Sequence, residues 1–178
     1  EFISQNIANF IWAYAKLAND DEAVARGVQD ECLRKLTYFS CQDLSTILWA
    51  FSTMSHREDS FLDSCTVTVR SRALTQPQHT SNTLWALATV VFYDGPCFTD
   101  LSRRAMLHLP AFKTQELSNT VWACAVVAHR DQELTDTIAR EAMSRLGEFD
   151  PQGVGNLAWA VAVLDTTMHE LYFRIWDR

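Results

Sequence analysis

The stretch QELSNTVWACAVV, residues 115–127, decides the fold, because close variants of it recur along the whole chain. Each variant has a tryptophan at its centre, and these tryptophans lie 37, 36, 37 and 37 residues apart: Trp12, Trp49, Trp85, Trp122 and Trp159. Self-similarity at one fixed spacing is typical of repeat proteins, in which each copy is one structural unit. The sequence therefore predicts a tandem array with a period of 36–37 residues.

Other residues recur in step with the tryptophan. A glutamine stands seven residues before it in every copy: Gln5, Gln42, Gln78, Gln115 and Gln152. Three residues before it, an asparagine stands in four copies, with Thr46 in the second: Asn9, Asn82, Asn119 and Asn156. These landmarks predict five units, residues 1–38, 39–74, 75–111, 112–148 and 149–178. Because the last unit is shortened, the chain is expected to be part of a longer array.

Each unit is expected to form two helices. On a helical wheel, the residues two and five positions before and after the tryptophan share one apolar side; in the second unit these are Leu44, Ile47, Phe51 and Met54. The first and third residues after the tryptophan are small and lie on opposite flanks, so a neighbouring helix can approach on each side. A second helix follows, and Asp59 and Asp131 stand where its N-cap is expected. The predicted fold class is all-α, an α-solenoid of tandem αα-hairpin repeats.

Composition excludes several classes of protein. No uninterrupted apolar run reaches the roughly 18 residues of a membrane-spanning helix, so no membrane span is expected. The five cysteines are odd in number and lack a CxxC pair, which indicates buried thiols in a reducing interior. The five histidines show neither HExxH nor another paired spacing of metal ligands. We therefore expect no metal, no cofactor, no small-molecule substrate and no enzymatic activity.

The recurring glutamine, asparagine and tryptophan share one side of the first helix in each unit. Such an uncharged strip could stack RNA bases on indoles and bond their edges through amides. Alternatively, the glutamine and asparagine bond each other or the backbone of the next unit, and the tryptophan fills the groove between units. The second interpretation is favoured, because a code for bases requires residues that differ between units, and these barely differ.

Two further columns are candidates for binding RNA or a partner protein. The first varies between units and lies six residues before the tryptophan: Asn6, Asp43, His79 and Glu116. Variable side chains on a regular scaffold could read sequence, although solvent exposure alone also permits variation. The second is basic and lies 23 residues after the tryptophan: Lys35, Arg72, His108 and Arg145. It could contact phosphates, but cations also favour helix C-termini, and this second explanation is preferred.

The repeat resembles a known group of organellar proteins. The pattern F-x-x-Q-x-[LIV]-[SA]-N-x-x-W-A-x-A, residues 112–125, is similar to octotricopeptide and heptatricopeptide repeats. It also resembles the helical repeats that precede RAP domains in FAST-kinase-like proteins. The resemblance implies an α-solenoid of a mitochondrion or plastid that binds single-stranded organellar mRNA or rRNA in processing, stability or translation. Some members of these families are instead structural subunits of organellar ribosomes.

The charge of the chain keeps a second function open. The sequence has 15 basic and 22 acidic residues, a formal net charge of −7, whereas affinity for nucleic acid comes largely from neutralising phosphates. Two functions therefore remain. One is RNA binding, as the resemblance implies, and the alternative is a protein-binding scaffold or accessory subunit of a large organellar complex such as a ribosome.

Overall fold

The computed structural model describes residues 3–19, 21–72 and 76–164, together with residues 171, 173 and 175. Every regular element in these residues is helical, and none is a strand, which confirms the all-α prediction. The α-helices are α1 (Ser4–Lys16), α2 (Glu22–Lys35), α3 (Cys41–Thr53), α4 (Asp59–Arg70), α5 (Pro77–Thr89), α6 (Gly95–His108), α7 (Thr114–Val126), α8 (Gln132–Ser144) and α9 (Pro151–Leu164). Short 3-10 helices follow α2, α6 and α8: η1 (Leu36–Tyr38), η2 (Leu109–Ala111) and η3 (Leu146–Glu148).

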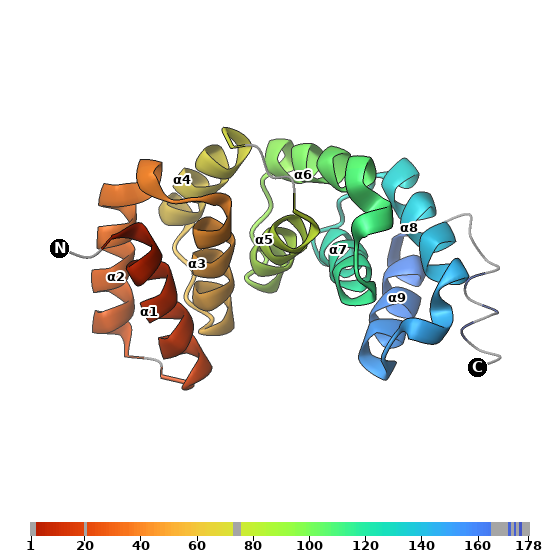
Figure 1. Cartoon of the computed structure of the whole chain (residues 1–178), viewed down its shortest axis with the longest axis horizontal. Helices are drawn as coiled ribbons and strands as arrows, with labels where there is room; N and C mark the ends of the chain where they lie inside the picture. The colour runs from red at the N-terminus through yellow and green to blue at the C-terminus, as the bar shows by residue number, and fades with distance from the viewer. Residues whose placement is uncertain are drawn as a thin grey trace.

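The helices form two layers of an arch. The odd-numbered helices, which carry the repeated tryptophans, pack side by side in chain order from α1 to α9. The even-numbered helices, α2 to α8, form a second layer in the same order. Figure 1 shows the odd-numbered helices along the concave inner side and the even-numbered helices along the outer side. This arrangement is the predicted α-solenoid. Parts of the predicted units, such as residues 1–2, 73–75 and 165–170, lie outside the described residues.

The apolar side of α3, α5, α7 and α9 is largely buried, as predicted, whereas in α1 two of its four residues are exposed, Phe10 (49%) and Leu17 (74%). In α3, Leu44, Ile47 and Phe51 are each 1% exposed. In α7, the corresponding residues Leu117, Thr120 and Cys124 are also buried. Removal of this apolar surface from water is the main favourable contribution to folding, at roughly 25 cal/mol per Å².

The small residues beside the tryptophan show which way each helix faces along the stack. The alanine directly after the tryptophan is exposed in α1 (Ala13) and buried in the four later helices: Ala50, Ala86, Ala123 and Ala160. The third residue after it is exposed only in α9 (Ala162) and buried in the four earlier helices: Ala15, Ser52, Ala88 and Ala125. The residue directly after the tryptophan therefore faces the preceding unit, and the third residue after it faces the following unit. Small side chains at both let the inner helices pack closely.

The turn inside each hairpin has an unusual backbone. The residue six positions after the tryptophan has a left-handed conformation with φ between 52° and 55°: Ala18, Ser55, Val91 and Ala128. The next amide then reaches back five residues, as in the bond of 2.8 Å from the His129 N–H to the Cys124 carbonyl. This is the Schellman motif, in which glycine usually holds the left-handed position. Here, the repeat builds the same turn without glycine.

Acidic side chains cap the outer helices at their N-termini. Asp131 caps α8 as predicted, with its carboxylate accepting a bond of 3.0 Å from the Leu134 N–H. For α4 the predicted Asp59 is wrong by one position. The cap is Glu58, whose carboxylate accepts from the Phe61 N–H at 2.7 Å, whereas Asp59 pairs with Arg57 at 2.7 Å. Among the described helices, none has the length and hydropathy needed to cross a membrane.

Candidate nucleic-acid interface

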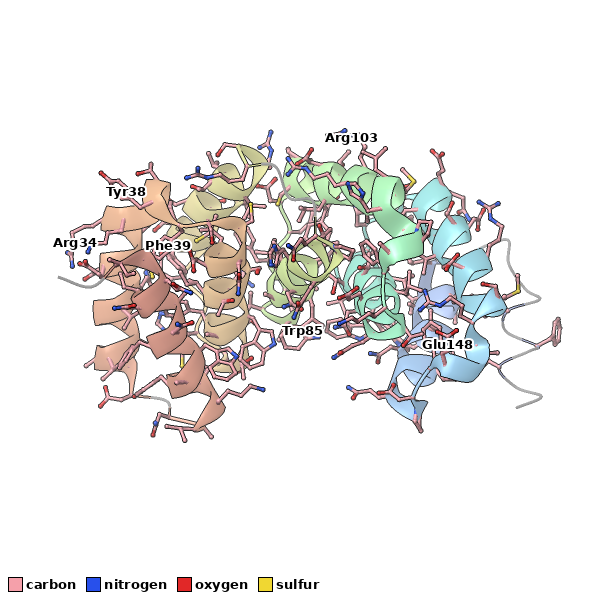
Figure 2. All side chains as sticks on the ribbon, in the orientation of Figure 1. Arg34, Tyr38, Phe39, Trp85, Arg103 and Glu148 are labelled. Carbon is pink, nitrogen blue, oxygen red and sulfur yellow. The ribbon has the colours of Figure 1, made fainter. Side chains whose placement is uncertain are left out.

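The repeated glutamine, asparagine and tryptophan line the inner side of the arch. They lie opposite the buried stripe of each inner helix, and Figure 2 shows Trp85 on the concave side of α5. All five glutamines are exposed. Asn9 is exposed, and the other three asparagines are half-buried. The strip predicted from the helical wheel is therefore a continuous, accessible surface.

The three middle tryptophans form a row of stacked rings. Trp49 lies beside Trp85 with 6.4 Å between ring centroids and 23° between ring planes. Trp85 lies beside Trp122 at 6.4 Å and 29°. Near-parallel aromatic contacts of this kind stabilise beyond the apolar area they bury. This three-indole row joins the second, third and fourth units along the inner face.

The two outer tryptophans differ from the middle three. Trp12 is 46% exposed and Trp159 is 45% exposed, and neither stacks on another aromatic ring among the described residues. The Lys16 ammonium lies 5.9 Å from the Trp12 ring centroid and 4.7 Å from that of Trp49. Both distances suit cation–π contact. Lys16 therefore sits between the first indole and the three-indole row.

The favoured sequence interpretation predicts that the repeated glutamines and asparagines bond each other or the backbone of the next unit, and the described residues do not show these bonds. Between described residues, no hydrogen bond involves the side-chain amides of the repeated glutamines and asparagines. They bond neither one another nor the backbone of the next unit. The tryptophan part of that interpretation does hold for the three middle units, whose indoles contact one another. The strip thus keeps free donors and acceptors beside aromatic rings.

The variable column is divided between capping and accessible side chains. Asp43 and Glu116 are each 8% exposed. The Asp43 carboxylate accepts from the Ser40 N–H at 2.9 Å, and that of Glu116 from the Lys113 N–H at 2.8 Å, so both cap the N-termini of their helices. The pattern Ser40-x-x-Asp43 is a capping box, a signal present in the sequence.

The other two members of the variable column can be reached from solvent. Asn6 is exposed, and His79 is half-buried with its pKa lowered by that burial. RNA contact by this column stays a prediction, and the geometry leaves Asn6 and His79 as the members free to make it.

The basic column lies at the ends of the outer helices, away from the inner strip. Lys35 pairs with Glu31 at 3.1 Å, and His108 is exposed. Arg72 donates to the Thr37 carbonyl, and Arg145 donates to the Phe112 carbonyl at 2.8 Å. In both cases the arginine clamps the segment that leads into the first helix of its own hairpin. Phosphate binding by this column stays a prediction, since two of its guanidinium groups already bond backbone.

A third arginine, which lies near the basic column but is not a member of it, makes the same kind of clamp. Arg104 donates to the Arg70 carbonyl at 3.0 Å and also to the Arg72 carbonyl. Its side chain is only 14% exposed, and it pairs with Asp100. Because Arg104 lies 19 rather than 23 residues after its tryptophan, the sequence column did not include it.

In a comparison with known protein families, residues 1–178 match the family of the RNA-editing substrate-binding complex 6 protein, RESC6. The chain belongs to this family. No individual curated protein matches it. The family that matches is RESC6, so the resemblance to octotricopeptide, heptatricopeptide and FAST-kinase-like repeats is not confirmed.

The buried histidine of this RESC6-family chain is part of its packing. His129 is 7% exposed, with one ring nitrogen 3.1 Å from the Tyr93 hydroxyl and the other 3.3 Å from the Ser102 hydroxyl. Burial lowers the pKa of His129, so its neutral form is favoured. The ring therefore joins a loop to an outer helix.

Within the part of the chain that the structure describes, the cysteines and charged residues bring no metal site together. Among the described residues, no group of three His, Cys, Asp or Glu side chains could hold a metal ion. None of the five cysteines forms a disulfide, and burial raises the pKa of the Cys32, Cys97 and Cys124 thiols to about 12. A cleft of about 680 Å³ lies between α2 and the turn after α3. Its lining includes Glu22 and Arg26, which pair with each other at 2.5 Å.

Proposed function

We propose that this chain is a non-enzymatic subunit of an RNA-editing complex and binds single-stranded RNA along the inner face of its solenoid. The family supports the first part, since its description names an RNA-editing substrate-binding complex. The observation that carries the second part is the accessible inner strip, in which indole rings alternate with amides that bond no described residue. A location in a mitochondrion or plastid is part of the proposal and rests on the resemblance alone.

The chemistry of the strip suits unpaired bases. Every base has a flat face that can stack on an aromatic ring, and such stacking contributes about 1–3 kcal/mol per base. Amides donate and accept hydrogen bonds, so they can match the edges that an unpaired base exposes. Bases in a duplex are already stacked and paired. The proposed ligand is therefore single-stranded.

The charges of the inner face predict an unusual dependence on salt. In the five inner helices the charged residues are Lys16, Asp43 and Glu116, and the two carboxylates are buried in helix caps. Few phosphates can then be neutralised, so the slope of log affinity against log salt should be shallow. Binding would depend on stacking and amide bonds.

A direct test uses fluorescence anisotropy with a labelled, unstructured oligoribonucleotide across a salt series, and a duplex of the same sequence as control. The expected result is binding of the single strand that weakens only slightly as salt rises, and weaker binding of the duplex. Absence of single-strand binding at low salt would reject the proposed RNA binding.

A second candidate function, a protein-binding scaffold within the complex, is favoured by one observation. A mostly apolar groove of about 320 Å³ lies on the outward face of α1 and α2, lined by Phe10, Val24 and Val28 among others. Phe10 is 49% exposed, whereas the residues at its position in later units are buried against a preceding hairpin: Ile47, Thr83, Thr120 and Leu157. The groove thus suits another αα-hairpin of the same type. Unchanged RNA affinity in a Phe10→Glu variant would separate this surface from the inner strip.

A further inference from the structure

The polar side chains of the inner strip share one chemical property. The position seven residues before the tryptophan carries an amide in every inner helix, and so does the position three before it, except that α3 has Thr46 there. An amide can both donate and accept hydrogen bonds, and so can the hydroxyl of Thr46. Neither position holds an ammonium or a guanidinium, which only donate, or an ionised carboxylate, which only accepts. The strip therefore offers both hydrogen-bonding roles on each inner helix.

The variable column adds no accessible side chain with a single hydrogen-bonding role. Its two acceptor-only members, Asp43 and Glu116, are each 8% exposed and bond backbone N–H groups as helix caps. Of the two members that solvent can reach, Asn6 carries an amide. Burial lowers the pKa of His79 and favours its neutral ring, which has one donor and one acceptor. Variation between the units thus gives the strip no fixed pattern of donors and acceptors.

The amides of the strip are also free to turn. Between described residues, none of them makes a hydrogen bond, and the last side-chain torsion of asparagine and glutamine has a broad energy profile. A half turn exchanges the amide oxygen and nitrogen. This holds in the middle of the array, since Asn82 and Asn119 lie on α5 and α7, which pack between inner helices on both sides. An amide selects a base edge only when the protein fixes its orientation, and no hydrogen bond from a described residue fixes these.

The four bases differ in the order of their donors and acceptors. On its pairing edge, uracil donates from N3–H and accepts at O4, whereas cytosine donates from its amino group and accepts at N3. In a duplex these edges are covered, and the major groove shows an adjacent donor and acceptor on adenine alone among the bases. In a single strand all four pairing edges are open. An amide that can turn matches each of them.

Resting on the proposed RNA binding, we infer that the inner strip binds unpaired RNA of any sequence, because its amides adapt to whichever base edge they meet. The indoles fit this ligand class, since every base has a face that can stack on an aromatic ring. The ligand is then defined by the absence of pairing and not by its sequence. Differences in affinity among unstructured strands arise from stacking strength and are modest.

Oligouridine and oligocytidine of equal length test the inference, because their rings have the same size and their donors and acceptors are exchanged. Fluorescence anisotropy with the intact chain should give affinities that differ by less than about fivefold, the smallest discrimination expected from one well-oriented bidentate contact. A larger difference would show that the strip selects a base. The inference would then be wrong, while the proposed RNA binding would stand.

Two variants of Asn119 show whether the amides contact the bases. Asn119→Leu removes the amide at similar size and should weaken binding of both strands by the same factor, about two- to tenfold. Asn119→Asp leaves acceptors only, which suit the amino group of cytosine and repel O4 of uracil. The ratio of affinities should therefore shift toward oligocytidine by about fivefold or more. The added charge repels the phosphates of both strands equally, so this ratio isolates the base contact.

Thermal unfolding shows which variants are folded, and affinities are compared among those. Gln115→Glu makes the same test at an exposed position one turn earlier if Asn119→Asp does not fold. If wild type binds both strands alike but the folded acidic variants keep the wild-type ratio, the amides do not contact the bases and the inference is wrong. It is also wrong if Asn119→Leu loses affinity for one strand only. If wild type binds neither strand, both the proposed function and the inference are rejected.

Discussion

The inner and outer layers of the solenoid differ in how regularly their sequences repeat and in how much charge they carry. The inner helices repeat the same glutamine, asparagine and tryptophan and pack through alanines and serines, with almost no charge. The outer helices vary more and carry surface ion pairs such as Arg34–Glu31 at 2.7 Å and Arg103–Asp100 at 2.9 Å. Figure 2 shows Arg103 on the outer side of the arch and Trp85 on the inner side.

The difference shows where stability and variation lie in this molecule. Buried apolar surface contributes far more free energy than exposed ion pairs, which typically contribute about 0–1 kcal/mol. The outer layer still holds the units in register, because its arginines clamp the segments between hairpins. Substitutions at the boundary between layers should therefore have the largest effects, clamps intermediate effects, and surface pairs almost none.

The largest effect is expected from Phe51→Ala, at the boundary between the layers. Phe51 is 1% exposed, and its ring packs edge-on against Phe61 with 5.1 Å between centroids. Removing it leaves a cavity, so the free energy of unfolding should fall by about 3–5 kcal/mol in urea denaturation. Thr53→Ala, an exposed change in the same helix, should lie within about 0.5 kcal/mol of wild type. A similar fall in the free energy of unfolding for Phe51→Ala and Thr53→Ala would show that the boundary between the layers contributes no more stability than the exposed side of the helix.

An intermediate effect is expected from Arg104→Met, which removes a clamp. The substitution leaves the Arg70 and Arg72 carbonyls without this donor in a partly buried place, so unfolding should become easier by about 1–3 kcal/mol. Arg103→Met is the matched control, because Arg103 also pairs with Asp100 but its side chain is 64% exposed. Equal stability of the two variants would show that Arg104 acts only as a surface charge.

Acid should weaken the contact between loop and outer layer at His129. Burial lowers the pKa of His129 in the folded chain, and the pKa values of His56 and His79 are lowered in the same direction. The unfolded state then binds more protons, so this stability is fully present above about pH 6.5 and is lost as pH falls below it. Urea midpoints from about pH 7.5 to about pH 5 should fall less steeply for His129→Gln than for wild type. A wild-type protein that becomes more stable as the pH falls would show that the lowered pKa of His129 does not control stability in this range.

Much of this architecture could be predicted from the sequence, because in a solenoid each unit contacts only its neighbours. The period, the tryptophan register and the buried stripe of Leu44, Ile47 and Phe51 follow from local pattern alone. Three features required coordinates. The carbonyl that Arg72 binds lies 35 residues away, at Thr37, and carbonyl positions leave no trace in sequence.

The other two features concern equivalence between units. Identical tryptophans gave no sign that the middle three stack while Trp12 and Trp159 stay half-exposed. The variable column was interpreted as one surface, although Asp43 and Glu116 serve as caps. The tryptophans have different neighbours in different units, and a wheel drawn for a single helix contains no neighbours. In the variable column the side chain itself differs, and the capping-box pattern Ser40-x-x-Asp43 was a sequence signal that the interpretation did not use.

The smallest effect, and the one expected to stabilise, is Val91→Gly in the turn between α5 and α6. Val91 has φ of 53° although it is β-branched, a conformation that L-residues with a branched Cβ strongly disfavour. It is 62% exposed, so glycine sacrifices little buried surface, and the bond of 3.2 Å from Arg57 to its carbonyl can persist. Relief of the strain exceeds the greater chain entropy of unfolded glycine, so the free energy of unfolding should rise by about 0.5–1 kcal/mol. Ala128→Gly, at the same position without a branch, should gain less. Urea denaturation compares the two, and a Val91→Gly protein less stable than wild type would show that the valine side chain supports the turn through packing.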